Sequence, residues 1–291
     1  MTQRPTTSRS PIATSRPLHA RLLAQDLGEL LESPRWHPTR QCISLVDIPT
    51  GRVIEITPAT HVVVEYSPGV VPLGAALPYN SGYLLVGADG IWEWSPNGAT
   101  TLWGSIPAQP RIVSNDAVFH GGAVWVGRMD VHEQQGAGSL WRITPDTAQP
   151  VVAGLTLPNG LVPAREGTDL LFAESAARRI YRVATQTRDL DSVVLEPFLE
   201  VPGWIPDGLA RDGSGHLWVA RWGEGIVTRV ATSSVPAFDV TAPTPQTTAA
   251  AFDPLGVMYV TTARENFDAQ QRLADPLAGS VFTASMFDTD R

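Results

Sequence analysis

The chain has 291 residues, of which 43% are hydrophobic, enough for a sizeable core, and it contains 25 glycines, 25 prolines and nine tryptophans. Glycine and proline in these numbers favour many short strands joined by tight turns, and they disfavour a helical fold. The formal net charge of −8 argues against nucleic-acid binding, because phosphate recognition requires a concentrated basic face and none is visible.

The chain begins with a segment, residues 1–17, that is basic and rich in Ser, Thr and Pro, with no apolar stretch like that of a secretory signal. We predict a disordered tail there, followed by a single domain over residues 18–291. A transit peptide also fits this composition, because the segment contains Arg and Ser without acidic residues.

Six later segments share one pattern: an apolar strand, a small or polar turn, and a second strand with alternating side chains. In chain order they begin at Leu45 (LVDIPTGRVIEI), Leu84 (LLVGADGIWEW), Val124 (VWVGRMD, then GSLWRI), Leu170 (LLFAESAARRIYRV), Leu217 (LWVARWGEGIVTRV) and Met258 (MYVTTAREN, then GSVFTA). The starts recur at roughly 40 to 47 residues, the span of one four-stranded propeller blade. We therefore predict an all-β fold, a six-bladed β-propeller around a central channel.

A propeller must close its ring. We expect the N-terminal strand, near Leu18 to Leu27, to complete the blade whose other strands come last, around Gly279 to Ser285, because closure removes open sheet edges. One short helix is predicted between Asn266 and Pro276, as an insertion in the last blade.

Four polar residues lie in short turns that we place just before strands: Glu32 in ESPRW, Asn115 in SNDAVF, Asn159 in LPNGLV and Asp207 in IPDGLA. Taken singly, Pro-Asn-Gly and Pro-Asp-Gly are ordinary turn signals. At equivalent blade positions, however, these side chains would point towards the axis, where two carboxylates repel unless a cation lies between them. Oxygen donors of this kind suit a hard divalent ion such as Ca²⁺ or Mg²⁺.

From about Leu27 to Phe282 the chain resembles the family of senescence marker protein (regucalcin), gluconolactonase and luciferin-regenerating enzyme. The matching blocks, in the same order, are GELLESPRWHP with LVDIPTGRV, SNDAVF, GLTLPNGLV with ESAARRIYRV, IPDGLARDGSGHLWVARWGEG, and MYVTTARENF with DPLAGSVF. The resemblance implies one divalent cation in the channel, bound by Glu32, Asn159 and Asp207. It also implies that Asp207 is the general base and that Asn115 lies near metal and substrate.

The chain departs from the family pattern next to Asn115. The family usually has Arg two residues before that Asn, and Gly two residues after it, where this chain has Val113 and Ala117. Arg128 and Arg111 are the nearby candidates to replace the missing guanidinium at the substrate. We also predict that His132 and Glu133, in a long loop after GRMD, contact the substrate.

These observations lead to a metal-dependent hydrolase that opens a small lactone, with Ca²⁺ as the first candidate cation and Zn²⁺, Mn²⁺, Mg²⁺ or Fe²⁺ also compatible with the ligands. Asp207 acts either as the base or as a nucleophile on the substrate. Two alternatives stay open: a phosphotriester hydrolase using the same metal site, and a non-catalytic propeller that binds calcium or another ligand.

Several other classes of protein are disfavoured. The sequence has no G-x-S-x-G, H-E-x-x-H or P-loop motif, and no run approaches the roughly 20 apolar residues of a membrane span. Cys42 is the only cysteine and lies in an apolar run, so we expect a buried side chain and a protein of the reducing cytoplasm. The expected partner is a small-molecule substrate, without nucleic acid, membrane or an obligate protein partner.

Overall fold

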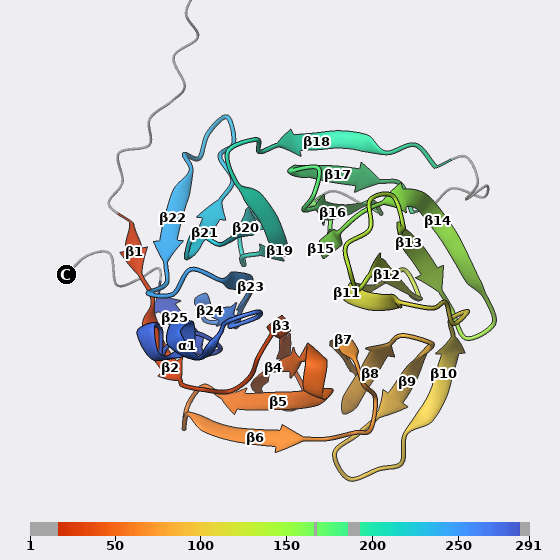
Figure 1. Cartoon of the computed structure of the whole chain (residues 1–291), viewed down its shortest axis with the longest axis horizontal. Coiled ribbons are helices and arrows are strands. Elements are labelled where there is room, and N and C mark those ends of the chain that lie inside the picture. Colours follow the sequence, from red (N-terminus) through yellow and green to blue (C-terminus); the bar gives the residue numbers. More distant parts are fainter. Residues whose placement is uncertain (1–16, 166–167, 186–192, 286–291) are drawn as a thin grey trace, which may run out of the picture.

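The structure, a computed structural model, describes residues 17–165, 168–185 and 193–285, and these residues form a six-bladed β-propeller (Figure 1). Blades 1 to 3, each given from the innermost strand outward, consist of β3 (Leu31–His37), β4 (Cys42–Asp47), β5 (Arg52–Thr57) and β6 (Val62–Tyr66); β7 (Leu73–Tyr79), β8 (Gly82–Gly87), β9 (Gly90–Trp94) and β10 (Thr101–Ser105); and β11 (Ile112–His120), β12 (Ala123–Asp130), β13 (Gly138–Ile143) and β14 (Ala148–Leu155).

Blades 4 to 6 follow the same order: β15 (Pro158–Pro163), β16 (Leu170–Glu174), β17 (Arg179–Val183) and β18 (Glu196–Glu200); β19 (Ile205–Arg211), β20 (Leu217–Trp222), β21 (Ile226–Arg229) and β22 (Phe238–Thr241); and β23 (Thr247–Phe252), β24 (Val257–Thr262), β25 (Val281–Ser285) and β2 (Arg21–Ala24). Each repeated sequence segment contains two consecutive strands of one blade, as predicted, and the structure shows that these are its second and third strands.

The ring is closed by the N-terminal strand β2, which pairs antiparallel with β25 through Leu22 and Phe282 and so completes blade 6 (Figure 1). This closure is the one predicted from the sequence. An additional strand that we did not predict, β1 (Leu18–His19), pairs parallel with β22 on the outer edge of blade 5. Residues 1–16 of the expected tail lie outside the described residues.

The predicted helix is also present, as α1 (Ala269–Ala274), and it begins with a capping box formed by Asp268 and Gln271. A single turn of 3₁₀ helix, η1 (Ile48–Thr50), follows β4. Across the described ranges, no helix is both long and apolar enough to cross a membrane.

The core consists of six apolar clusters, one at each interface between neighbouring blades. Strand β4 illustrates how one strand serves two interfaces. Ile43 and Leu45 pack against blade 6, whereas Val46 packs against blade 2. Because successive side chains of a strand point to opposite faces, a sheet covered on both faces needs a nearly continuous apolar run, and CISLVD is fully buried, including Cys42.

The innermost strands β3, β7, β11, β15, β19 and β23 contact one another in a ring around the axis. Each of these strands has a register shift of the β-bulge type in its first half. Glu32, Asn115, Asn159 and Asp207 lie at four of these bulges, so the expectation that they precede the strands in turns is wrong.

Glycines at the bulges allow the inner strands to approach closely. A Cβ atom on Gly160 would lie 2.4 Å from the carbonyl oxygen of Asp207, and one on Gly208 would lie 2.3 Å from the Cβ of Ala249. The glycines of the Pro-Asn-Gly and Pro-Asp-Gly motifs are therefore required by close packing between blades. A bulge also re-aims the neighbouring side chain, which here faces the channel.

Candidate active site in the central channel

Carboxylates at the ends of second strands hold the chain in place where it enters two of the inner strands. Asp47, the last residue of β4, accepts hydrogen bonds from the amides of Glu29 and Leu30 at 2.9 and 3.1 Å. Glu174, the last residue of β16, accepts two bonds at 3.1 and 2.9 Å from the amides just before β15. These bonds fix the entry to β3 and β15, and hence the positions of the channel residues that follow.

A cavity of about 250 Å³ opens at the end of the channel where the inner strands begin. It is lined by Leu30, Glu32, Asn115, Met129, Glu133, Leu157, Asn159, Ser175, Ile205, Asp207, Trp222, Glu265 and Asn266. Five of the residues predicted for the site therefore share one cavity, although they come from four blades.

The polar side chains in this cavity differ in how many of their hydrogen-bonding atoms have a partner. One oxygen of Glu32 accepts a hydrogen bond from the amide of Ser33 at 2.9 Å, and the amide nitrogen of Asn115 donates to the carbonyl of Pro158 at 3.2 Å. The Oδ1 atom of Asn159 accepts a bond from the amide of Gly160 at 3.2 Å. The Oδ1 atom of Asp207, by contrast, is buried and has no hydrogen-bond partner among the residues that the structure describes.

Burial raises the pKa of the Glu32 carboxyl, and the charge of Asp116 raises it further. The pKa of Asp207 also lies well above its ordinary range, first because of burial and then because of the nearby charges of Glu32, Asp116 and Glu265. The two carboxyls thus lie close together in a buried place that disfavours their ionised forms. Such a cluster is unfavourable unless protons or a cation neutralise it.

This donor set fits a hard divalent cation. Two carboxylates that repel each other, amide oxygens beside them and a buried oxygen without a partner are the features that an oxygen-ligated cation would satisfy. Within the described part of the chain, no three His, Cys, Asp or Glu side chains gather as a metal-binding group. Binding of a cation would therefore depend on the amides of Asn159 and Asn115 as well as on Glu32 and Asp207.

The structure does not bring Arg128 to the cavity, contrary to the expectation from the sequence. Its guanidinium is fully buried and donates to the carbonyls of Ala88 at 3.0 Å and Pro107 at 3.3 Å, and it stacks over the ring of Trp141. Burial lowers the pKa of this group. The carbonyls of blade 2 therefore hold Arg128 between blades 2 and 3, away from the channel.

The other two basic candidates are also outside the lining. Arg111 is exposed and forms an ion pair with Asp130 at 3.0 Å. His132, in the loop after β12, is exposed, whereas its neighbour Glu133 does line the cavity. No basic side chain is among the residues that line the cavity.

Several lining residues were missed by the sequence reasoning, notably Ser175, Trp222 and Glu265. The hydroxyl of Ser175 donates to the carbonyl of Pro206 at 2.6 Å and so links blade 4 to the inner strand of blade 5. Their position in the repeat could have identified these residues. In each blade the second strand ends on the same face of the propeller on which the inner strand begins. Asp116 was also missed; it pairs with Arg35 at 3.2 Å below the cavity floor.

Comparison with known proteins agrees with this architecture. Residues 30–264 match the family described as the SMP-30/gluconolactonase/LRE-like region. The chain belongs to this family. It is 30% identical to the pentonolactonase XacC of Haloferax volcanii over 272 residues, which cover 89% of this chain and 92% of that protein. It is 29% identical to the L-arabinolactonase of Azospirillum brasilense over 187 residues, 61% of each chain.

Among solved structures, a calcium-binding regucalcin from Agrobacterium tumefaciens superposes with a TM-score of 0.83 at 28% identity, covering 94% of this chain and 95% of that one. The luciferin-regenerating enzyme superposes with a TM-score of 0.74 at 22% identity, a likeness of fold. The family resemblance seen in the sequence motifs is confirmed by these matches.

Proposed function

We propose that the protein is a divalent-metal-dependent lactonase whose active site is the channel cavity. The observation that carries this proposal is the buried, unpartnered Oδ1 atom of Asp207 in a cavity that also holds Glu32, Asn115 and Asn159. The relatives named as lactonases support the choice of reaction. In this proposal Glu32, Asn159 and Asp207 hold the cation, for which Ca²⁺ is the first candidate because every donor is an oxygen.

A cation held by Glu32, Asn159 and Asp207 would supply Lewis-acid chemistry, that is, polarisation of the lactone carbonyl and stabilisation of negative charge on its oxygen. The protein residues move the proton. As the oxygen of a water molecule bonds to the carbonyl carbon, the carboxylate of Asp207 accepts a proton from that water. The ring C–O bond then breaks, and the proton passes from Asp207 to the departing ring oxygen, giving an open-chain hydroxy acid. Direct attack of Asp207 on the carbonyl is the alternative.

The remaining lining residues indicate which lactones fit. Four acidic residues line the cavity: Glu32, Asp207, Glu133 and Glu265. If Glu32 and Asp207 bind the cation, Glu133 and Glu265 are left facing the substrate. Most of the other large side chains that line the cavity are apolar: Leu30, Met129, Leu157, Ile205 and Trp222. An uncharged lactone is therefore favoured over one that carries a phosphate, sulfonate or second carboxylate, because such an anion would meet Glu133 and Glu265 without a guanidinium to pair with it.

The same apolar lining favours a second candidate reaction, hydrolysis of neutral phosphotriesters. These substrates also lack charge and also require a polarised oxygen next to a water molecule. The position of Asp207 is compatible with either reaction, so the two functions differ by substrate and can be separated by assay.

A substrate panel tests the proposal directly. Turnover of neutral sugar lactones, alkyl-substituted γ-lactones, a phosphorylated sugar lactone and a neutral phosphotriester would be measured with and without EDTA, followed by addition of Ca²⁺, Mn²⁺ or Zn²⁺. We expect EDTA-sensitive opening of neutral lactones and at least tenfold slower turnover of the phosphorylated one. Efficient turnover in excess EDTA would refute the metal dependence, and turnover of the phosphotriester alone would select the second reaction.

A further inference from the structure

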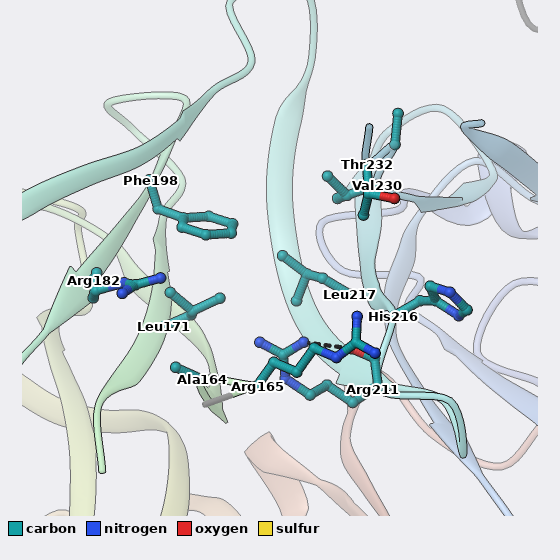
Figure 2. A pocket seen from close by; sticks show the side chains of 12 residues that line it. Ala164, Arg165, Leu171, Arg182, Phe198, Arg211, His216, Leu217, Val230 and Thr232 are labelled. Carbon is teal, nitrogen blue, oxygen red and sulfur yellow. Dashed lines mark hydrogen bonds between the residues drawn. The ribbon is translucent and has the colours of Figure 1, made fainter. Parts of the chain in front are cut away.

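A second cavity of about 250 Å³ lies between blades 4 and 5 at the opposite face of the propeller (Figure 2). Strand β19 connects the two sites, since Asp207 lies near its start and Arg211 is its last residue. At about 3.3 Å per residue the two positions are roughly 13 Å apart along the strand. The lining of this second cavity contains no residue of the channel cavity.

Three arginines from two blades meet in this cavity. Figure 2 shows Arg165 and Arg211 next to each other and Arg182 entering from blade 4. Arg211 is held by hydrogen bonds to the carbonyls of Pro163 and Gly215, both at 2.7 Å. The side chain of Arg165 packs over Gly215, where a Cβ would lie 3.5 Å from its Nε atom.

The positive charge of this cluster is poorly balanced. Within the described ranges neither Arg165 nor Arg211 has an ion-pair partner, and Arg182 reaches Asp169 only at 3.9 Å. The nearby carboxylate of Asp212 accepts hydrogen bonds from the ring of Trp218 at 2.9 Å and from the amide of its own turn at 3.0 Å. Burial and then the charge of Arg165 lower the pKa of Arg211, and the charge of Asp212 opposes this shift only in part.

The rest of the cavity is apolar. Leu171 and Phe198 come from blade 4, and Leu217 and Val230 from blade 5, opposite one another across the opening (Figure 2). The guanidinium of Arg182 stacks over the ring of Phe198 at 5.7 Å from its centroid, so the charged and apolar parts of the cavity are contiguous. A ligand that matches this surface carries a negative head group and a short apolar body.

We propose that the cavity between blades 4 and 5 is a binding site for a small amphipathic anion, a carboxylate or phosphate joined to a short hydrocarbon group. Guanidinium groups bind both head groups through paired N–H donors. The side chains of Arg165 and Arg182 donate no hydrogen bond to any other residue that the structure describes, whereas Arg211 contributes charge from a fixed position. The site is independent of the channel chemistry, so it stands or falls separately from the lactonase proposal.

The test measures binding of hexanoate and hexyl phosphate to the intact protein by titration calorimetry, with inorganic phosphate and hexanol as controls. We expect both hexyl anions to bind at least tenfold more tightly than either control, and the tighter of the two identifies the head group. Hexanol binding as tightly as hexanoate, or absence of binding by both anions at millimolar concentration, would overturn the proposal.

The chain offers a matched control. Arg142 on β13 of blade 3 occupies the position that Arg182 has on β17 of blade 4. Each pairs with the second residue of its repeated sequence segment, Trp125 in the segment from Val124 or Leu171 in the segment from Leu170. Arg165→Ala and Arg182→Ala should each weaken binding at least tenfold, and Arg142→Ala should leave it unchanged. Equal loss in all three variants would mean that the anion responds only to net charge, and no loss in the first two would place it elsewhere.

Discussion

At the scale of single residues, the proposed reaction would require Asp207 to be both acidic enough to bind a cation and basic enough to accept a proton. Its environment raises its pKa in the absence of a cation, because it is buried and close to Glu32 and Asp116. A bound cation opposes this shift by favouring the ionised form. In the proposed mechanism, these two opposing influences would together leave the carboxylate available as a base inside the channel.

The substitution Asp207→Asn separates these two roles. It keeps the volume of the side chain and one metal-binding oxygen but removes the basic carboxylate, so turnover on the best lactone should fall about 10²-fold or more. The metal content, measured on the purified variant, should fall much less. A variant that retains turnover within a few-fold of the wild type while loaded with metal would make Asp207 a ligand only.

The raised pKa of Asp207 also predicts a pH dependence of stability in the metal-free protein. A carboxyl with a folded-state pKa above its unfolded value of about 3.9 holds its proton better when folded, so its contribution to stability is lost as the pH rises through the folded pKa. Metal-free Asp207→Asn should therefore be more stable than metal-free wild type near pH 8, and the two should converge towards pH 4. Urea denaturation at a series of pH values measures this; a difference that does not change with pH would contradict it.

Arg128 is a third residue whose role follows from its contacts. Its removal leaves the carbonyls of Ala88 and Pro107 without their donor and opens space beside Trp141. We expect Arg128→Ala to lower the free energy of unfolding by about 2–4 kcal/mol while the KM of the metal-loaded enzyme stays unchanged. An increased KM at unchanged stability would instead return Arg128 to the substrate.

At the scale of secondary-structure elements, the bulges of the inner strands place the candidate ligands. The register shifts by one residue at the same stage of every inner strand, and a bulge directs a side chain away from the plane of the ladder. The glycines at these points allow one inner strand to touch the next. The channel site is thus formed at six equivalent bulges, one in each inner strand. At two of them the residue is neither an acid nor an amide: Gly74 and Thr248.

The N-terminal strands provide an element-scale test. Deletion of residues 1–20 removes β1, which pairs with β22 through two residues, whereas deletion of residues 1–24 also removes β2 and exposes the edge of β25. We expect the shorter deletion to change the melting temperature by a few degrees at most. The longer one should lower it strongly and cause aggregation, because an open edge strand recruits other chains. Similar melting and solubility of the two variants would argue against closure by β2.

At the scale of the whole molecule, the proposed cation site joins blades 1, 4 and 5 through Glu32, Asn159 and Asp207. Blades 4 and 5 pack against each other through an apolar cluster, but blade 1 shares no such cluster with either of them. A cation bound at this site would therefore cross-link the ring across its axis. The second cavity, between blades 4 and 5, is lined by three arginines and no acid among the described residues.

This arrangement predicts that cation binding stabilises the entire propeller. A cation present at 100 times its dissociation constant should raise the free energy of unfolding by about 2.7 kcal/mol, in a single cooperative transition. Melting curves recorded in EDTA and after addition of Ca²⁺ measure this gain. Identical curves would show that the channel does not bind Ca²⁺.

The strands, the blade count and the ring closure were predictable because their causes are local or repetitive. Alternation of apolar side chains identifies a strand wherever it lies, and the repeat length identifies the blade. The turn-like motifs around Asn159 and Asp207 were misread as turns because Pro-Asn-Gly and Pro-Asp-Gly have the same local conformational preferences in a turn and in a bulge. The difference lies in the neighbouring inner strand, which the local sequence does not contain.

The sequence alone therefore determined the fold and, through its family motifs, which oxygen-bearing side chains meet at the axis: Glu32, Asn115, Asn159 and Asp207. Only the tertiary structure decided where the arginines point. The position of Arg128 depends on carbonyls at Ala88 and Pro107 in the preceding blade. The cluster at the second cavity likewise forms because two blades bring together residues that are separated along the chain. Long basic side chains reach partners across a blade interface, and those partners are fixed by packing and not by sequence spacing.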